Sequence, residues 1–146
     1  MPERHPLHPA LVHFPIVCWT LATVGDVISP WWGIRAWWTS GMLLVLGIVM
    51  ALPAMISGLV EFSQIDEQSA ALPVAERHMQ LICITWTIYA ASLFMRMDGR
   101  HLAQPGLVAI GLSLLGLGFL LSACWFGGRL VYRYRVGVTE EDEVLR

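Results

Sequence analysis

Four long stretches without Asp, Glu, Lys or Arg constrain this sequence more than any other feature. They cover residues 5–25, 36–60, 79–95 and 101–128. An α-helix rises about 1.5 Å per residue, so about 20 apolar residues cross the roughly 30 Å core of a lipid bilayer. Lipid offers the backbone no hydrogen-bond partners, so a spanning segment must satisfy its own groups, as a helix does. The pattern predicts membrane-spanning helices near 9–29, 38–60, 78–96 and 105–127.

The composition supports a membrane protein and excludes several other classes. Only 14% of the 146 residues are charged and 56% are hydrophobic, whereas a soluble domain carries about 25% charge. This composition argues against an ordinary soluble enzyme, and it excludes a disordered chain. The formal net charge of −2 leaves no basic excess for nucleic acid. We predict one all-α domain over 1–146: an integral membrane four-helix up-down bundle in the lipid bilayer, with a short amphipathic tail over 129–146.

The arginines indicate an orientation. With four spans, the N-terminus, the connector 61–77 and the C-terminus share one membrane side, which carries six of the nine arginines. The other side carries Arg35, Arg96 and Arg100. The positive-inside rule therefore favours both termini on the inside. The first span has no cleavage pattern of a signal peptide, and we expect it to stay as an anchor.

Span alternation also places the residues that could carry chemistry. The start of the first span, the end of the second, the start of the third and the end of the fourth meet at one membrane face. That face collects His8, His13, Glu61, Arg77, His78, Trp125, Arg129 and Tyr132. The opposite face carries only Asp26, Arg35, Asp98 and His101, and the sequence assigns no role to them.

Two histidines at the first face are candidate ligands. His13 lies five residues beyond His8, about 7.5 Å deeper along a helix, and His78 opens the third span at a similar depth. An ionisable residue inside a span indicates function. We expect His13 and His78 to face each other across the bundle, where imidazoles hold haem iron or a transition metal. The alternative is that they hydrogen-bond at helix ends. The three cysteines, one in each of three spans, predict no disulfide and fit as small hydrophobic residues.

Several motifs resemble one known family. HPALVHFPI at 8–16 resembles the HPxxVHFPI opening of the bacterial DUF2231 family, described as predicted membrane proteins. GLVE at 58–61 is similar to its GxxD, and GGRLVYRYRVGV at 127–138 to its closing GGxLVYxxGxGV. His78 and Asp26 are similar to a His and an acidic residue of the family. The resemblance covers 8–138 and implies a four-span protein of the bacterial cytoplasmic membrane without a known activity. Relatives joined to Rieske or c-type cytochrome domains imply a link to electron transfer.

The sequence departs from the family pattern at three positions. Glu61 replaces an Asp and keeps the carboxylate on a longer side chain. Arg129 stands where relatives often have an acidic residue, which changes the charge beside the histidines. Arg135 stands where the family usually has Gly, so a tight turn there would require an arginine at positive φ.

Three functions remain open from the sequence. The first is a small b-type cytochrome, a redox carrier rather than an enzyme with its own substrate, that passes electrons between quinol and a partner protein. Its haem b would be ligated by His13 and His78, or His8 would replace one of these two. Arg129 or Arg77 would pair with the propionates. The pocket walls would be Phe14, Trp125 and Tyr132.

The second function is binding of a divalent transition metal by His8, His13, Glu61 and His78, since four N and O ligands suit zinc. The third is a structural or assembly subunit without a cofactor, in which the same polar residues clamp helix ends. A homo-oligomer is compatible with all three.

Overall fold

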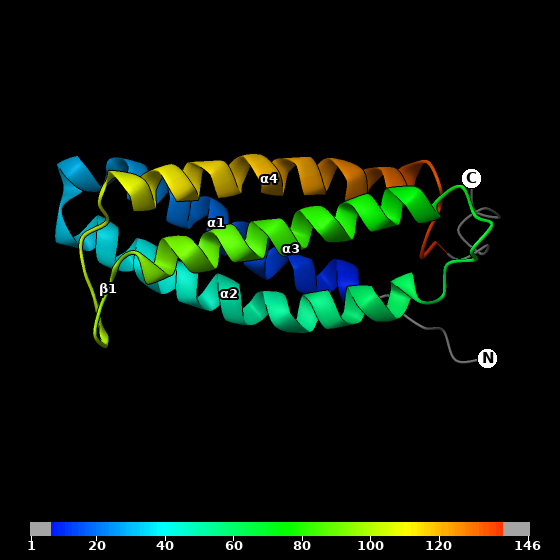
Figure 1. The fold of residues 1–146 in the computed structure, drawn as a ribbon, viewed down its shortest axis with the longest axis horizontal. Coiled ribbons are helices and arrows are strands. Elements are labelled where there is room, and N and C mark those ends of the chain that lie inside the picture. The colour runs from blue at the N-terminus through cyan, green and yellow to red at the C-terminus, as the bar shows by residue number, and fades with distance from the viewer. Residues whose placement is uncertain (1–6, 139–146) are drawn as a thin grey trace.

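The chain forms a bundle of four antiparallel helices (Figure 1). The computed structural model describes residues 7–138, which contain α1 (Leu7–Trp32), α2 (Ile34–Phe62), α3 (Leu72–Phe94) and α4 (Leu107–Tyr132). The expected all-α up-down bundle is confirmed. Arg4, one of the six arginines assigned to the side of the two termini, lies outside the described residues, as does the end of the predicted tail over 139–146.

The helices are longer than the uncharged runs predict. The connector between α1 and α2 is the single residue Gly33, at φ 66°, where we expected a longer interfacial loop. Glycine suits this position because it adopts positive φ without steric cost. α3 begins at Leu72 rather than near 78, and α4 continues to Tyr132, so the predicted tail begins as helix.

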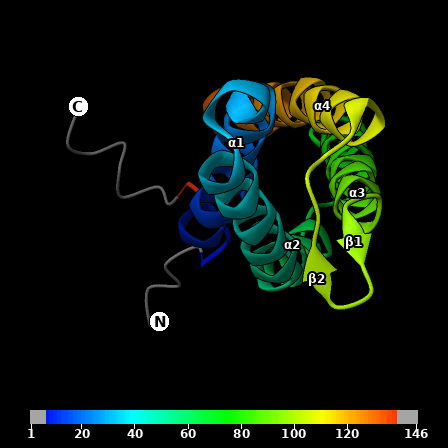
Figure 2. The same cartoon turned by 90° about the vertical axis from the view of Figure 1, so that its left-hand side faces the viewer.

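The bundle consists of two helical hairpins. α1 packs along α2 and α3 packs along α4, whereas contacts between the two hairpins are fewer. Viewed along its length, the bundle places α1 diagonally opposite α3 (Figure 2). Two short strands, β1 (Met97–Asp98) and β2 (His101–Leu102), pair antiparallel after α3 and close one end of the bundle.

The surface of the bundle is apolar and its interior is partly polar. Large side chains such as Leu121, Trp125 and Ile56 are exposed along the helices, which suits contact with lipid. Within the described residues, α1, α2 and α4 are long and apolar enough to cross a membrane, while α3 is less hydrophobic. The interior contains alanines and glycines, which let helices approach closely in a membrane.

Candidate functional site

A charged pair lies buried at the end of the bundle opposite the histidines. Asp26 in α1 and Arg96, just after α3, are 0% and 1% exposed. Arg96 Nη1 and Nη2 donate to the two carboxylate oxygens of Asp26 at 2.6 and 2.5 Å. This fork-to-fork geometry is the strongest form of an arginine–carboxylate contact.

Serines from three helices complete the hydrogen bonding of this pair. Ser40 of α2 and Ser113 of α4 each donate to the Asp26 carboxylate. The other guanidinium hydrogens of Arg96 go to Ser40 Oγ, Ser92 Oγ and Ser92 O. All five guanidinium N–H groups therefore have an acceptor, and one network joins all four helices.

The sequence did not reveal this centre. From the sequence, Asp26 was placed on the membrane face opposite the histidines and given no role. Arg96 was counted among the loop charges on the outer side of the membrane. Asp26 does lie at that end of the bundle, but the assignment of Arg96 to an exterior loop is wrong. The backbone of Arg96 extends the last turn of α3, and its side chain turns inward to Asp26. The signal that could have revealed this pair was an ionisable residue inside a helical span. The uncharged runs ended at residues 25 and 95, one position before each charge.

An aromatic pair occupies the middle of the bundle. Trp19 of α1 stacks on Tyr89 of α3, with ring centroids 5.0 Å apart and planes 14° apart. The Tyr89 hydroxyl lies 2.9 Å from Thr23 Oγ1, and both side chains are buried. Thr23 also donates to the Trp19 carbonyl, so the hydroxyls inside the bundle remain hydrogen-bonded.

The histidine end brings His8 and His78 together. His8 Nδ1 lies 2.8 Å from the Ala54 carbonyl of α2, and His78 Nδ1 lies 2.9 Å from the Ala123 carbonyl of α4. Their ring centroids are 6.5 Å apart, with planes at 85°. Glycines leave room for the rings: an added Cβ would lie 2.8 Å from His8 Cε1 at Gly58 and 3.1 Å from His78 Cε1 at Gly127.

These contacts determine the tautomer of both imidazoles. A carbonyl oxygen accepts hydrogen bonds only, so each Nδ1 carries the proton and donates. Each Nε2 then holds a free lone pair when the ring is neutral. A histidine that binds a metal through Nε2 is oriented in this same way by an Nδ1–H bond to a carbonyl.

His13 does not face His78. Its side chain is exposed, because five residues along an α-helix turn the side chain by about 140°. His8 points into the bundle, and His13 points away from it. The expected pair of His13 and His78 is therefore replaced by His8 and His78, which was the second ligand choice from the sequence.

The other sequence candidates surround the histidines loosely. Phe14, Trp125 and Tyr132 are 60%, 71% and 90% exposed, so they face outward rather than wall a closed pocket. Arg129 lies over the Phe126 ring, 5.8 Å from its centroid, and Arg77 is exposed. No group of three or more His, Cys, Asp or Glu side chains that could hold a metal is present among residues 7–138. The four expected metal ligands thus do not form one such group, although two of them, His8 and His78, lie together.

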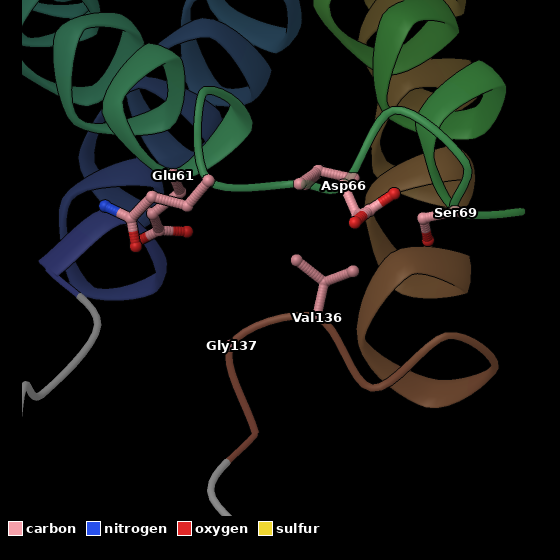
Figure 3. Close-up of a pocket in the computed structure, with 7 residues that line it drawn as sticks. Glu61, Asp66, Ser69, Val136 and Gly137 are labelled. Atoms are coloured by element: carbon pink, nitrogen blue, oxygen red, sulfur yellow. The ribbon is translucent and has the colours of Figure 1, made fainter.

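Glu61 belongs to a neighbouring cavity instead. It lines a cavity of about 330 Å³ with Asp66 and Ser69 of the α2–α3 loop and Val136 of the segment after α4. Figure 3 shows these side chains around the opening between the loop and that segment. Neither His8 nor His78 lines this cavity, so it is separate from the histidine pair.

The turn after α4 forms despite the arginine at the family's glycine position. Arg135 adopts φ 53°, the left-handed conformation that glycine favours. The Val136 N–H then reaches the Leu130 carbonyl at 3.0 Å and closes the helix end. The backbone keeps the expected turn at the cost of some strain at Arg135.

Fold and site together define a helical membrane protein with a buried ion pair at one end and a facing histidine pair at the other. The family described as predicted membrane protein (DUF2231) matches residues 4–140. The chain belongs to the DUF2231 family, as its motifs indicate. No curated protein and no solved structure matches the chain in the same comparisons.

Proposed function

We propose that the protein is a small membrane electron carrier whose haem iron is bound between His8 and His78. The observation that supports this proposal is the pair of facing imidazoles, each fixed through Nδ1 so that Nε2 is free. A haem bound there would supply a one-electron iron couple.

The ring separation suits ligation from two sides. The two ring centroids are 6.5 Å apart, so one group held between the rings could contact both imidazoles. Residues on diagonally opposed helices of a bundle commonly hold a cofactor in this manner.

The number of donors favours haem over a bare divalent ion. Structural zinc takes four protein ligands and catalytic zinc takes three, whereas the described part of the chain gathers two imidazoles. A porphyrin brings nitrogen ligands of its own, so haem would need fewer ligands from the protein than a bare ion. His8 and His78 would hold it, and the carbonyls of Ala54 and Ala123 would keep the two rings oriented.

The test is haem titration of the detergent-purified protein, followed by absorption before and after reduction. We expect one haem per chain with a low-spin spectrum. His8→Ala and His78→Ala should each lose that spectrum. His13→Ala is the matched control, since His13 is on the same helix as His8 but exposed, and it should keep the spectrum. Failure of the wild type to bind haem, or equal loss in all three variants, would refute the proposal.

A second candidate function has its own observation. The same Nδ1–H bonds join α1 to α2 and α3 to α4, which is what a cofactor-free assembly subunit requires. In that case His8→Ala and His78→Ala would lower the thermal stability of a colourless protein. The Nδ1 bonds alone do not require the two rings to face each other, and for this reason we favour the haem carrier.

A further inference from the structure

The two hairpins repeat one pattern of residues. In α1, His8 is followed by Trp19 eleven residues later and by Asp26 seven residues after that. In α3, His78, Tyr89 and Arg96 have the same spacing. Steps of eleven and seven residues each return to nearly the same side of an α-helix. The three residues of each set therefore lie on one face, the face toward the bundle axis.

The contacts inside each hairpin repeat as well. His8 bonds the Ala54 carbonyl and lies against Gly58, while His78 bonds the Ala123 carbonyl and lies against Gly127. An added Cβ would touch Trp19 from Gly47, and it would touch Tyr89 from Gly116. The glycines of each hairpin are eleven residues apart, and the α4 members follow their α2 counterparts by 69 positions.

Equivalent residues meet each other across the bundle axis. His8 faces His78, Trp19 stacks on Tyr89, and Asp26 pairs with Arg96. The members of each pair are 70 positions apart. Contact between equivalent residues is what an approximate two-fold axis along the bundle requires. The chain thus consists of two helical hairpins that share one pattern of residues at the bundle axis.

One of the three pairs differs in kind from the others. The first two pairs join residues of the same class, histidine with histidine and aromatic with aromatic. Asp26 and Arg96 carry opposite charges at equivalent, fully buried positions. If two first hairpins met, two carboxylates would be buried together, and two second hairpins would bury two guanidinium groups.

We propose that this charge asymmetry makes the hairpin surface selective, so that each hairpin accepts only a hairpin with the opposite charge at the equivalent position. Burying like charges is costly, and specificity in pairing commonly comes from such repulsion. The partner that the α1–α2 surface fits is an α3–α4 hairpin, and pairing of like hairpins between two copies of the chain is excluded.

The test uses full-length chains in which one charge is reversed. Asp26→Arg leaves two cations on the axis, and Arg96→Asp leaves two anions. When the two variants are co-expressed with different tags, each hairpin finds its opposite charge only in the other chain. We expect them to copurify as an exchanged dimer that is more thermally stable than either variant alone. The matched control reverses the exposed charges Arg35 and Asp98 at the same end of the bundle, and that pair of variants should not copurify.

A second variant makes the test decisive if the reversed charges do not fit among the serines. Asp26→Leu with Arg96→Met removes both charges. Its own two hairpins stay tethered, so this variant should be monomeric in dilute solution. When two differently tagged copies are unfolded and refolded together at high concentration, they should form more mixed dimer through like hairpins than two wild-type copies do. Single reversals that stay monomeric and as stable as the wild type would overturn the proposal. So would an uncharged variant that forms no more mixed dimer than the wild type under the same refolding conditions.

Discussion

Replacing Arg96 by methionine should destabilise the bundle more than replacing both members of its ion pair. The single replacement leaves the Asp26 carboxylate buried without its cation. Only the two serine hydroxyls that donate to it would remain, from Ser40 and Ser113. The double replacement Asp26→Leu with Arg96→Met leaves no buried charge behind.

The expected magnitudes follow from burial. Both side chains have 0% exposed area, and breaking such a pair by removing one partner costs about 3–5 kcal/mol of unfolding free energy. Replacing the whole pair by apolar residues of similar volume is often nearly neutral. The double variant should therefore cost several kcal/mol less than the two single variants added together. The remaining cost comes from Ser40, Ser92 and Ser113, which lose partners.

The assay is a double-mutant cycle on unfolding free energies, measured in detergent micelles by denaturant titration. Wild type, both single variants and the double variant are compared under one set of conditions. If the losses from the two single variants simply add in the double variant, the ion pair is not coupled and the reasoning is refuted.

Two further predictions concern packing and orientation. Gly47→Ala should lower the unfolding free energy by about 1–3 kcal/mol, because the added Cβ would lie 2.7 Å from the Trp19 ring. The control Gly118→Ala, whose Cβ meets open space, should change the unfolding free energy little. Equal effects of the two variants in thermal unfolding would contradict this packing. The arginines favour an orientation with both termini inside, which can be tested with single cysteines in a background without native cysteines. A cysteine at exposed Gln68 should resist a membrane-impermeant thiol reagent in intact cells, while one at exposed Arg100 should react. The reverse labelling would show the opposite orientation.

The four helices and the histidine end could be predicted from the sequence because each depends on a simple regularity. Runs without charge locate helices in lipid, and alternation of direction brings four helix ends to one face. The choice between His8 and His13 could not be made from depth alone. It depends on which side of α1 faces the bundle interior. Once Trp19 and Asp26 are known to be buried, the spacing of eleven and seven residues places His8 on that same side.

The ion pair escaped prediction for a different reason. Charges at the ends of apolar runs usually lie at the membrane surface, so Asp26 and Arg96 were assigned to span ends. Only the packed bundle shows that Asp26, Ser40 and Ser92 together accept from every guanidinium N–H of Arg96. Ser40 and Ser113 also donate to the Asp26 carboxylate. The shared spacing of eleven and seven residues was present in the sequence. That this spacing brings the residues into contact can be recognised only once α1 and α3 are known to lie diagonally opposite each other across the bundle axis.

The most direct test of the histidine site is the absorption spectrum of wild-type protein, oxidised and then reduced with dithionite, with haem quantified on the same sample. The account predicts about one haem per chain and a sharp Soret band that shifts on reduction, with resolved α and β bands. A colourless protein that stays colourless after haem is supplied would contradict it.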